Sequence, residues 1–316
     1  MSDGFSAKLR RVGCALVCVS AAACSGNDRA EPLGAVNIAP PIEIGAQSNR
    51  NSSNPVLVTA VNNEVSPGDA LTMVFSDEFD GDALDSSVWF FETGDGTEYG
   101  IPGWGNNELQ YYLPDSAQLE DGMLKITARE EQVGAFQYTS ARLNTRDRFA
   151  FSYGRIEARM RVPAGQGVWP AFWLLSQDSP YGSWAATGEI DVMEAINLGG
   201  TGGNRVFGTI HYGGEFPGNL SSSQTYVVPD SAVDEFHVYA IEWDATEIRW
   251  YVDDVLYYTE TDWSSTAAAY PAPFDQNFYI IFNVAVGGNF PGSPDAGTVF
   301  PVTMEVDWVR VYSGEP

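Results

Sequence analysis

The order of apolar and polar positions along the chain predicts a protein built from β-strands. Residues 154–162 alternate strictly between apolar and charged side chains, and the apolar set is Ile156, Ala158, Met160 and Val162. A period of two is typical of a strand with one buried face. Further strands are expected at 235–243, 277–286 and 303–312, with a hairpin over 247–260 that turns at Asp253 and Asp254.

The number and spacing of these strands predict an all-β fold. Within roughly 245 residues they favour an antiparallel β-sandwich over an α/β arrangement. A sheet of this kind can curve and leave one concave face as an open substrate cleft. Trp243, Trp250 and Trp308 stand within apolar strand segments and are expected in the core. The strands belong to a single domain over 69–316, without an internal repeat.

The residues before this domain have a different composition. Basic residues at 8–11 precede a short apolar run at 12–19, which predicts a secretory signal over 1–23 that is too short to span a bilayer. The small residues before Cys24 are similar to a bacterial lipobox, in which the cysteine is lipidated; ordinary cleavage after Ala23 is the alternative. Residues 24–68 are rich in Asn, Ser and Pro and predict a flexible tether.

These features predict an exported protein, held in the cell envelope (the outer membrane) by a lipid anchor at Cys24, or secreted. The chain has three cysteines, all near the N-terminus, so a disulfide framework for the domain is excluded. With 16 basic against 42 acidic residues, the net charge is −26, which disfavours nucleic acid and anionic membrane surfaces as partners. Uncharged sugars meet no such repulsion. A monomer is expected.

The stretch GEIDVMEA at 188–195 carries three acids among apolar residues. On a regular strand Glu189 and Asp191 share a face, whereas Glu194 points to the other side because five residues separate it from Glu189. A β-bulge within 191–194 would correct the parity, since one extra residue shifts the rest by one position. All three acids would then line one face, with Ile190 and one or both of the residues at 192 and 193 in the core.

Acids placed in this way suit glycoside hydrolysis with retention, which needs two carboxyl groups about 5–5.5 Å apart, one as nucleophile and one as proton donor. The charge of Asp191 between them would help to keep the proton donor protonated. An acidic strand edge and a metal site are the alternatives. The sequence has no G-x-S-x-G elbow, CxxC pair or phosphate loop, and neither histidine has partners that suggest a serine triad.

Several motifs together resemble glycoside hydrolase family 16, and within it the bacterial laminarinases, which are endo-acting β-1,3-glucanases. They are GEIDVMEA, GWGNNELQYY (103–112), GVWPAFWLL (167–175), GTIHYGG (208–214) and FNVAVGGNFPG (282–292). The resemblance runs from about residue 74 to residue 312. It implies a β-jelly roll with a concave sheet, and the extra residue in EIDVME is similar to the bulged branch of the family.

The resemblance also implies roles for individual residues. Glu189 would be the nucleophile, Glu194 the general acid/base, and Asp191 the residue that assists them. Phe290 stands where many laminarinases have Trp, which puts a stacking role there in doubt. The residues implied to contact sugar in the cleft are Asn107, Arg142, Trp169, Trp173, Trp184 and His211.

A structural calcium is common in the family. By position it would be held by Glu78, the backbone of Gly122 and Asp307. Catalysis itself would need no cofactor. The expected activity is therefore endo-hydrolysis of β-1,3-glucan with retention. Two alternatives stay open: the same site acting on another polysaccharide (mixed-linkage β-glucan, agarose or carrageenan), and a non-catalytic β-glucan-binding module.

Overall fold

The computed structural model describes residues 71–200, 203–228 and 235–314. The signal segment 1–23, Cys24 and the tether 24–68 lie outside these residues and stay predictions. Within the described part of the chain, the helices are three short 3-10 turns at Thr97–Tyr99, Pro102–Gly105 and Pro114–Ser116. None of the helices described is long and apolar enough to cross a membrane.

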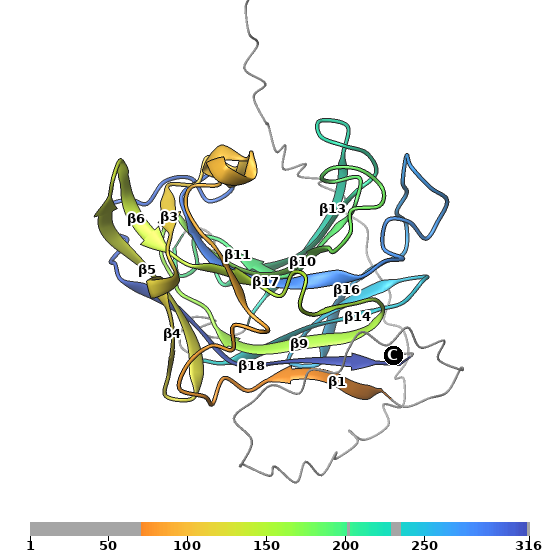
Figure 1. Ribbon diagram of the computed structural model, residues 1–316, viewed down its shortest axis with the longest axis horizontal. Coiled ribbons are helices and arrows are strands. Elements are labelled where there is room, and N and C mark those ends of the chain that lie inside the picture. The colour runs from red at the N-terminus through yellow and green to blue at the C-terminus, as the bar shows by residue number, and fades with distance from the viewer. Residues whose placement is uncertain (1–70, 201–202, 229–234, 315–316) are drawn as a thin grey trace, which may run out of the picture. The chain divides into compact units, whose positions relative to one another are not determined.

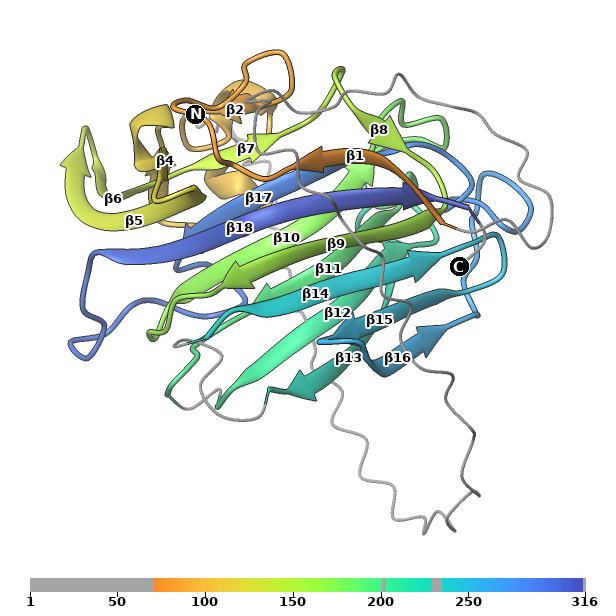
Figure 2. The same cartoon turned by 90° about the horizontal axis from the view of Figure 1, so that it is seen from below.

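Two sheets packed face to face form the domain, as the strand pattern predicted (Figure 2). The ten-stranded sheet has the order β16-β15-β14-β9-β18-β5-β6-β3, with β1 and β4 attached to β18 and β5. Its pairs are antiparallel except for β3 with β6, which are parallel. Its strands are β1 (Thr72–Asp77), β3 (Gln110–Tyr112), β4 (Ala117–Glu120), β5 (Met123–Val133), β6 (Phe136–Ser140), β9 (Gly154–Arg161), β14 (His237–Trp243), β15 (Ile248–Val252), β16 (Val255–Glu260) and β18 (Val302–Ser313).

The eight-stranded sheet has the order β13-β12-β11-β10-β17-β7-β2, with β8 attached to β17. Figure 1 shows β10, β11 and β17 in one layer above β9 and β18, with β13 bending upward so that the outer face of this sheet is concave. Its strands are β2 (Phe90–Glu92), β7 (Arg142–Asn144), β8 (Ala150–Phe151), β10 (Val168–Ser176), β11 (Glu189–Ala195), β12 (Arg205–Tyr212), β13 (Leu220–Val227) and β17 (Phe278–Val286).

The predicted strands are confirmed in position, and the predicted buried face of residues 154–162 is confirmed as well. The alternating segment at 154–162 forms β9, and its four apolar side chains are fully buried between the sheets. The hairpin over 247–260 forms β15 and β16, and it turns at Asp253 and Asp254, both of which have positive φ. Such φ values suit the tight hairpin turns that match the twist of the strands.

One core prediction was wrong. Trp243 and Trp250 are fully buried, but Trp308 is partly exposed. The guanidinium carbon of Arg310 lies 4.1 Å from the ring centroid of Trp308. The pairing of β18 with β9 shifts by one residue between Val306 and Trp308, so a bulge at Asp307 turns Trp308 to the outer face. The pattern of apolar residues contains this change of parity, because Met304 and Val306 are followed by Val309 and Val311, but the sequence reading treated Trp308 only as part of an apolar strand.

Candidate active site

A β-bulge in β11 brings the three acids to one face. Opposite β12, Asp191 pairs with Thr209 and Glu194 with Phe207, so three steps along β11 match two along β12. Opposite β10, the same extra residue falls between Asp191 and Met193. The predicted bulge is therefore confirmed within 191–194, and it restores the parity that Glu194 would otherwise lack.

The residues between the acids point into the sandwich. Ile190, Val192 and Met193 all belong to the hydrophobic core, and both residues at the bulge are buried there. Glu189 and Asp191 lie on the concave side, where their side chains are 13% and 4% exposed. The strand thus uses its apolar positions to fix the backbone while its carboxyl groups stand on the opposite side.

Two tryptophans hold the outer two carboxyl groups. Trp184 Nε1 donates a hydrogen bond to Glu189 Oε2 at 3.0 Å, and Trp169 Nε1 donates one to Glu194 Oε1 at 2.9 Å. Each acid therefore has one oxygen occupied by an indole and the other left for chemistry. The sequence predicted both tryptophans at the site, but as stacking surfaces rather than as hydrogen-bond donors.

His211 lies across from the acids on β12. Its Nε2 is 3.5 Å from Asp191 Oδ2 and 3.7 Å from Glu189 Oε1. Burial lowers the pKa of this imidazole, but the contact with Asp191 and the negative charges of Glu189 and Glu194 outweigh burial and raise its pKa to about 9. A protonated imidazole at neutral pH partly balances the acidic cluster.

The pKa values of both glutamates are raised, that of Glu189 to about 7 and that of Glu194 well above its ordinary value. Burial is the largest cause for each, followed by the charge of Asp191, while His211 acts in the opposite direction. With both pKa values raised, the two carboxyl groups together retain a proton near neutral pH. One ionised and one protonated carboxyl group on the same face is the combination that retaining glycoside hydrolysis requires.

Arg142 and Trp173 form the floor of the concave face beside the acids. Arg142 is buried, forms an ion pair with Glu92, and places its Cζ 4.5 Å from the ring centroid of Trp104 and 4.8 Å from that of Trp173. Trp173 Nε1 also donates to Asn283 Oδ1 at 2.8 Å. In this arrangement Arg142 packs against both tryptophan rings and helps to hold Trp173 in place. Direct contact of Arg142 with sugar stays a prediction.

Glu108 is a site component to which the sequence reading gave no role. Its buried carboxylate accepts hydrogen bonds from the side chains of Asn106, Gln110 and Tyr112 at 2.7–3.2 Å. Tyr112 in turn accepts from Asn283 Nδ2 at 3.2 Å, which links this network to Trp173. Burial raises the pKa of Glu108, against the opposing charge of Arg142. The sequence did contain a signal for this role, because Glu108 is the acid in GWGNNELQYY, a motif otherwise rich in uncharged polar residues.

Two loops meet at the end of the concave face near Trp169. Asn107, which is exposed, donates from Nδ2 to Asn289 Oδ1 at 2.9 Å and so joins the loop at 103–109 to the loop after β17. Phe290 packs edge-on against Trp169, with ring centroids 5.4 Å apart. Phe290 therefore supports the tryptophan that holds Glu194, a role that sequence reasoning did not find.

Two sets of residues could hold a metal ion. Glu189, Asp191 and His211 offer ligand atoms that all lie within 4.8 Å of one another. Since a retaining mechanism uses these carboxyl groups directly, a metal there would compete with catalysis. The second set is the predicted calcium site on the other sheet.

The segments of the calcium set meet beside the middle of β18. Asp307 lies in the middle of β18. Strand β1 ends one residue before Glu78 and pairs with the C-terminal half of β18. Strand β5 begins one residue after Gly122 and pairs with the N-terminal half of β18. Carboxylate and carbonyl oxygens suit calcium. Both carboxylates form partly exposed ion pairs, Glu78 with Arg310 and Asp307 with Arg159, and such pairs contribute little stability. The residues are of a type that calcium binds, but both carboxylates are paired with arginines in this structure, so the calcium site stays a prediction.

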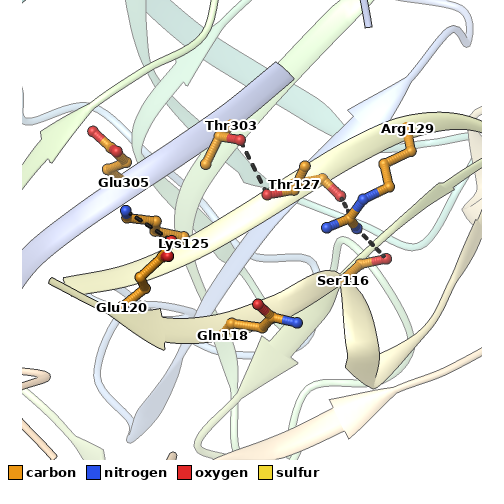
Figure 3. A pocket seen from close by; sticks show the side chains of 8 residues that line it. All are labelled: Ser116, Gln118, Glu120, Lys125, Thr127, Arg129, Thr303 and Glu305. Atoms are coloured by element: carbon orange, nitrogen blue, oxygen red, sulfur yellow. Dashed lines mark hydrogen bonds and ion pairs between the residues drawn. The ribbon is translucent and has the colours of Figure 1, made fainter. Parts of the chain in front are cut away.

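A separate hollow of about 260 Å³ lies on the outer face of the ten-stranded sheet (Figure 3). Its charges are largely matched, since Lys125 pairs with Glu120 and Glu305 pairs with Arg161. No aromatic side chain lines it in the described part of the chain, so it offers no surface on which a sugar ring could stack. The lining residues are Ser116, Gln118, Glu120, Lys125, Thr127, Arg129, Thr303 and Glu305.

Comparison with known proteins agrees with the geometry. Residues 87–310 match the family model of glycosyl hydrolases family 16. The chain is 44% identical over 262 residues to glucan endo-1,3-beta-glucosidase A1 of Niallia circulans, covering 77% of this chain but only 38% of that protein. It is 42% identical to a beta-glucanase of Rhodothermus marinus, covering 76% of this chain and 84% of that protein. The laminarinase catalytic domain of Thermotoga maritima superposes with a TM-score of 0.70 at 38% identity, covering 78% of this chain and all of that domain.

Proposed function

The chain belongs to glycosyl hydrolase family 16, and from this premise we propose that it is an endo-acting hydrolase that cleaves β-1,3-glucan with retention. The observation that carries the proposal is the bulge in β11, which brings Glu189 and Glu194 to one face of the concave sheet. The relatives named glucan endo-1,3-beta-glucosidase and laminarinase support the choice of substrate. A non-catalytic glucan-binding module would need neither the bulge nor both glutamates.

In the first step, ionised Glu189 attacks the anomeric carbon while Glu194 donates its proton to the departing glycosidic oxygen. The hydrogen bond from Trp184 occupies Glu189 Oε2, which leaves Oε1 for attack. Trp169 donates to Glu194 Oε1, so the acidic proton sits on the other oxygen of Glu194. The product is a covalent glycosyl-enzyme, and the other part of the glucan chain leaves.

In the second step, Glu194 is ionised and takes a proton from water, which attacks the same carbon from the side that the departed chain occupied. The bond to Glu189 breaks and the sugar recovers its original configuration. The protonated imidazole of His211 lies near Glu189 and Asp191, where it stabilises negative charge as the carboxylate returns.

A substrate panel tests the proposed activity. Release of reducing ends should be fastest from laminarin and slower from lichenan, agarose and carrageenan. Carrageenan should be the poorest substrate, because its sulfate groups meet a protein of net charge −26. Preferred release from agarose or carrageenan would contradict the assignment of the substrate, and no release from any polymer would contradict the assignment of an enzyme.

Asp191→Asn should move the pH profile toward lower pH. Activity needs Glu189 ionised and Glu194 protonated, and the negative charge of Asp191 raises the pKa of both. Removing that charge lets each glutamate ionise at lower pH, so both limbs of the kcat/KM profile shift down. We also expect kcat to fall on the order of 10²-fold, because an electrostatic partner of the reacting groups is lost.

The profile of kcat/KM on laminarin from pH 4 to pH 10 measures this effect. Asp262→Asn is a matched control, since Asp262 is exposed on the loop that follows β16. Its profile should coincide with that of the wild type. An Asp191→Asn profile with unshifted limbs would show that this carboxylate does not set the pKa values of its neighbours.

We also expect calcium to stabilise the domain without taking part in catalysis. Glu78, Asp307 and the carbonyl group of Gly122 would hold the ion. Saturating calcium should raise the Tm by about 5 °C relative to EDTA, because a ligand that binds only the folded state adds to its stability. Glu78→Gln should lose this increment and keep the wild-type rate at the assay temperature. Equal melting temperatures in calcium and in EDTA would contradict the site.

Export is part of the same proposal, although its signals lie outside the described residues. Cell fractionation should place the protein in the envelope through a lipid on Cys24, and Cys24→Ser should abolish membrane attachment. Recovery of both proteins in the medium would favour plain secretion after cleavage at Ala23.

A further inference from the structure

Phe216 is an exposed aromatic residue at the edge of the site, and the catalytic assignment gives it no role. It lies on the loop between β12 and β13, and 44% of its surface is exposed. Single exposed apolar residues are common on proteins and need no explanation by themselves. Phe216 differs because of how its loop is held and what lies beside it.

The loop that carries Phe216 is fixed to the site at three points. The N–H of Phe216 donates to the carbonyl of Trp184 at 3.1 Å, and the N–H of Thr266 donates to the carbonyl of Gly213 at 2.7 Å. The carboxylate of Glu215 accepts from the N–H of Ser183 at 2.9 Å. These bonds restrain the backbone from Gly213 to Phe216, so the ring of Phe216 starts from a fixed point of the chain.

The ring of Phe216 extends the surface of Trp184. The two ring centroids are 6.4 Å apart and the planes are inclined by 32°. Trp184 is itself 38% exposed, and its indole nitrogen holds the nucleophile Glu189. An aromatic surface therefore runs outward from the catalytic carboxyl group, first over Trp184 and then over Phe216.

We propose that Phe216 forms an additional sugar-binding subsite next to Trp184, occupied by one glucosyl unit of the same glucan chain. This inference rests on the proposed function. A pyranose ring has apolar C–H faces that stack on aromatic rings, and an uncharged sugar is compatible with this acidic protein. The carboxylate of Glu215 beside it is exposed and accepts from the N–H of Ser183, and its charge does not repel an uncharged sugar.

Kinetics on substrates of different length test the subsite. Phe216→Ala should raise the KM for laminarin and for long laminari-oligosaccharides roughly 3- to 10-fold and leave kcat within about twofold, because stacking is lost equally before and in the transition state. The shortest oligosaccharide that the enzyme cleaves should be unaffected. Phe216→Trp, which keeps an aromatic ring at this position, should have a KM close to that of the wild type. Leu256→Ala, a control on β16 of the other sheet with 49% exposure, should change nothing.

Each other outcome has a definite meaning. An unchanged KM and an unchanged dependence on length in Phe216→Ala would overturn the subsite and leave the proposed function intact. An equal fall in kcat on substrates of every length would mean that Phe216 only supports Trp184, which also overturns the subsite. If the wild type does not cleave laminarin, both the function and the subsite are wrong.

Discussion

Glu189→Gln should lower kcat on laminarin by at least about 10⁴-fold and leave binding of the glucan nearly unchanged. An amide cannot attack the anomeric carbon as a carboxylate does, so the covalent intermediate does not form. The substitution keeps the shape of the side chain, and the amide oxygen can still accept the hydrogen bond from Trp184 Nε1. Loss of rate without loss of binding is the signature of a group that acts only in the reaction.

Steady-state rates and calorimetric titration with a laminari-oligosaccharide would measure the two quantities on the same preparation. Glu98→Gln is the matched control, because Glu98 is exposed on a short 3-10 turn. It should retain wild-type rates and affinity. Turnover of Glu189→Gln within tenfold of the wild type would remove Glu189 from the role of nucleophile.

The loss of rate caused by Glu194→Gln should depend on the leaving group of the substrate. This dependence distinguishes the role of Glu194 from that of Glu189. On laminarin, kcat should fall about 10²- to 10⁴-fold, because the departing oxygen receives no proton. A β-glucoside with an activated aryl leaving group needs no proton to depart, so the first step should survive. The second step should then be slow because no base activates water, and the glycosyl-enzyme should accumulate.

Mass spectrometry of the intact protein would detect the accumulated intermediate, and peptide mapping would locate it. The added mass should lie on a peptide containing Glu189. The same activated substrate should leave Glu189→Gln unmodified. A glycosylated peptide that lacks Glu189, or normal hydrolysis of laminarin by Glu194→Gln, would refute the division of roles between the two acids.

The sequence predicts those parts of the fold and site that depend on the order of neighbouring residues within one strand. Alternation at 154–162 is a property of nine adjacent residues, and β9 follows it closely. The bulge in β11 could be inferred in the same way, because the parity of Glu189 and Glu194 is visible in the spacing of the acids. Trp308 was misplaced although the spacing carries a similar mark: the apolar positions 304 and 306 are followed by 309 and 311, so their parity changes across Asp307, and the sequence reading did not use this change.

The contacts that support the site depend on residues far apart in the chain, which explains why they were not predicted. Arg142 lies between Trp104 and Trp173, and its ion-pair partner is Glu92 on a different strand. The hydrogen bonds that link Glu108 to Trp173 run through Tyr112 and Asn283, and Asn283 comes from β17. A motif shows that such residues are grouped in the sequence, but only the register of the sheet shows which of them touch.

The central claim is that the bulge in β11 lets Glu189 and Glu194 act together on one sugar in two displacements. The configuration of the first product tests it most directly. Proton NMR during the first minutes of laminari-oligosaccharide hydrolysis should show the new reducing end as the β-anomer, with the α-anomer appearing later by mutarotation. Initial release of the α-anomer would mean a single displacement by water and would contradict the account.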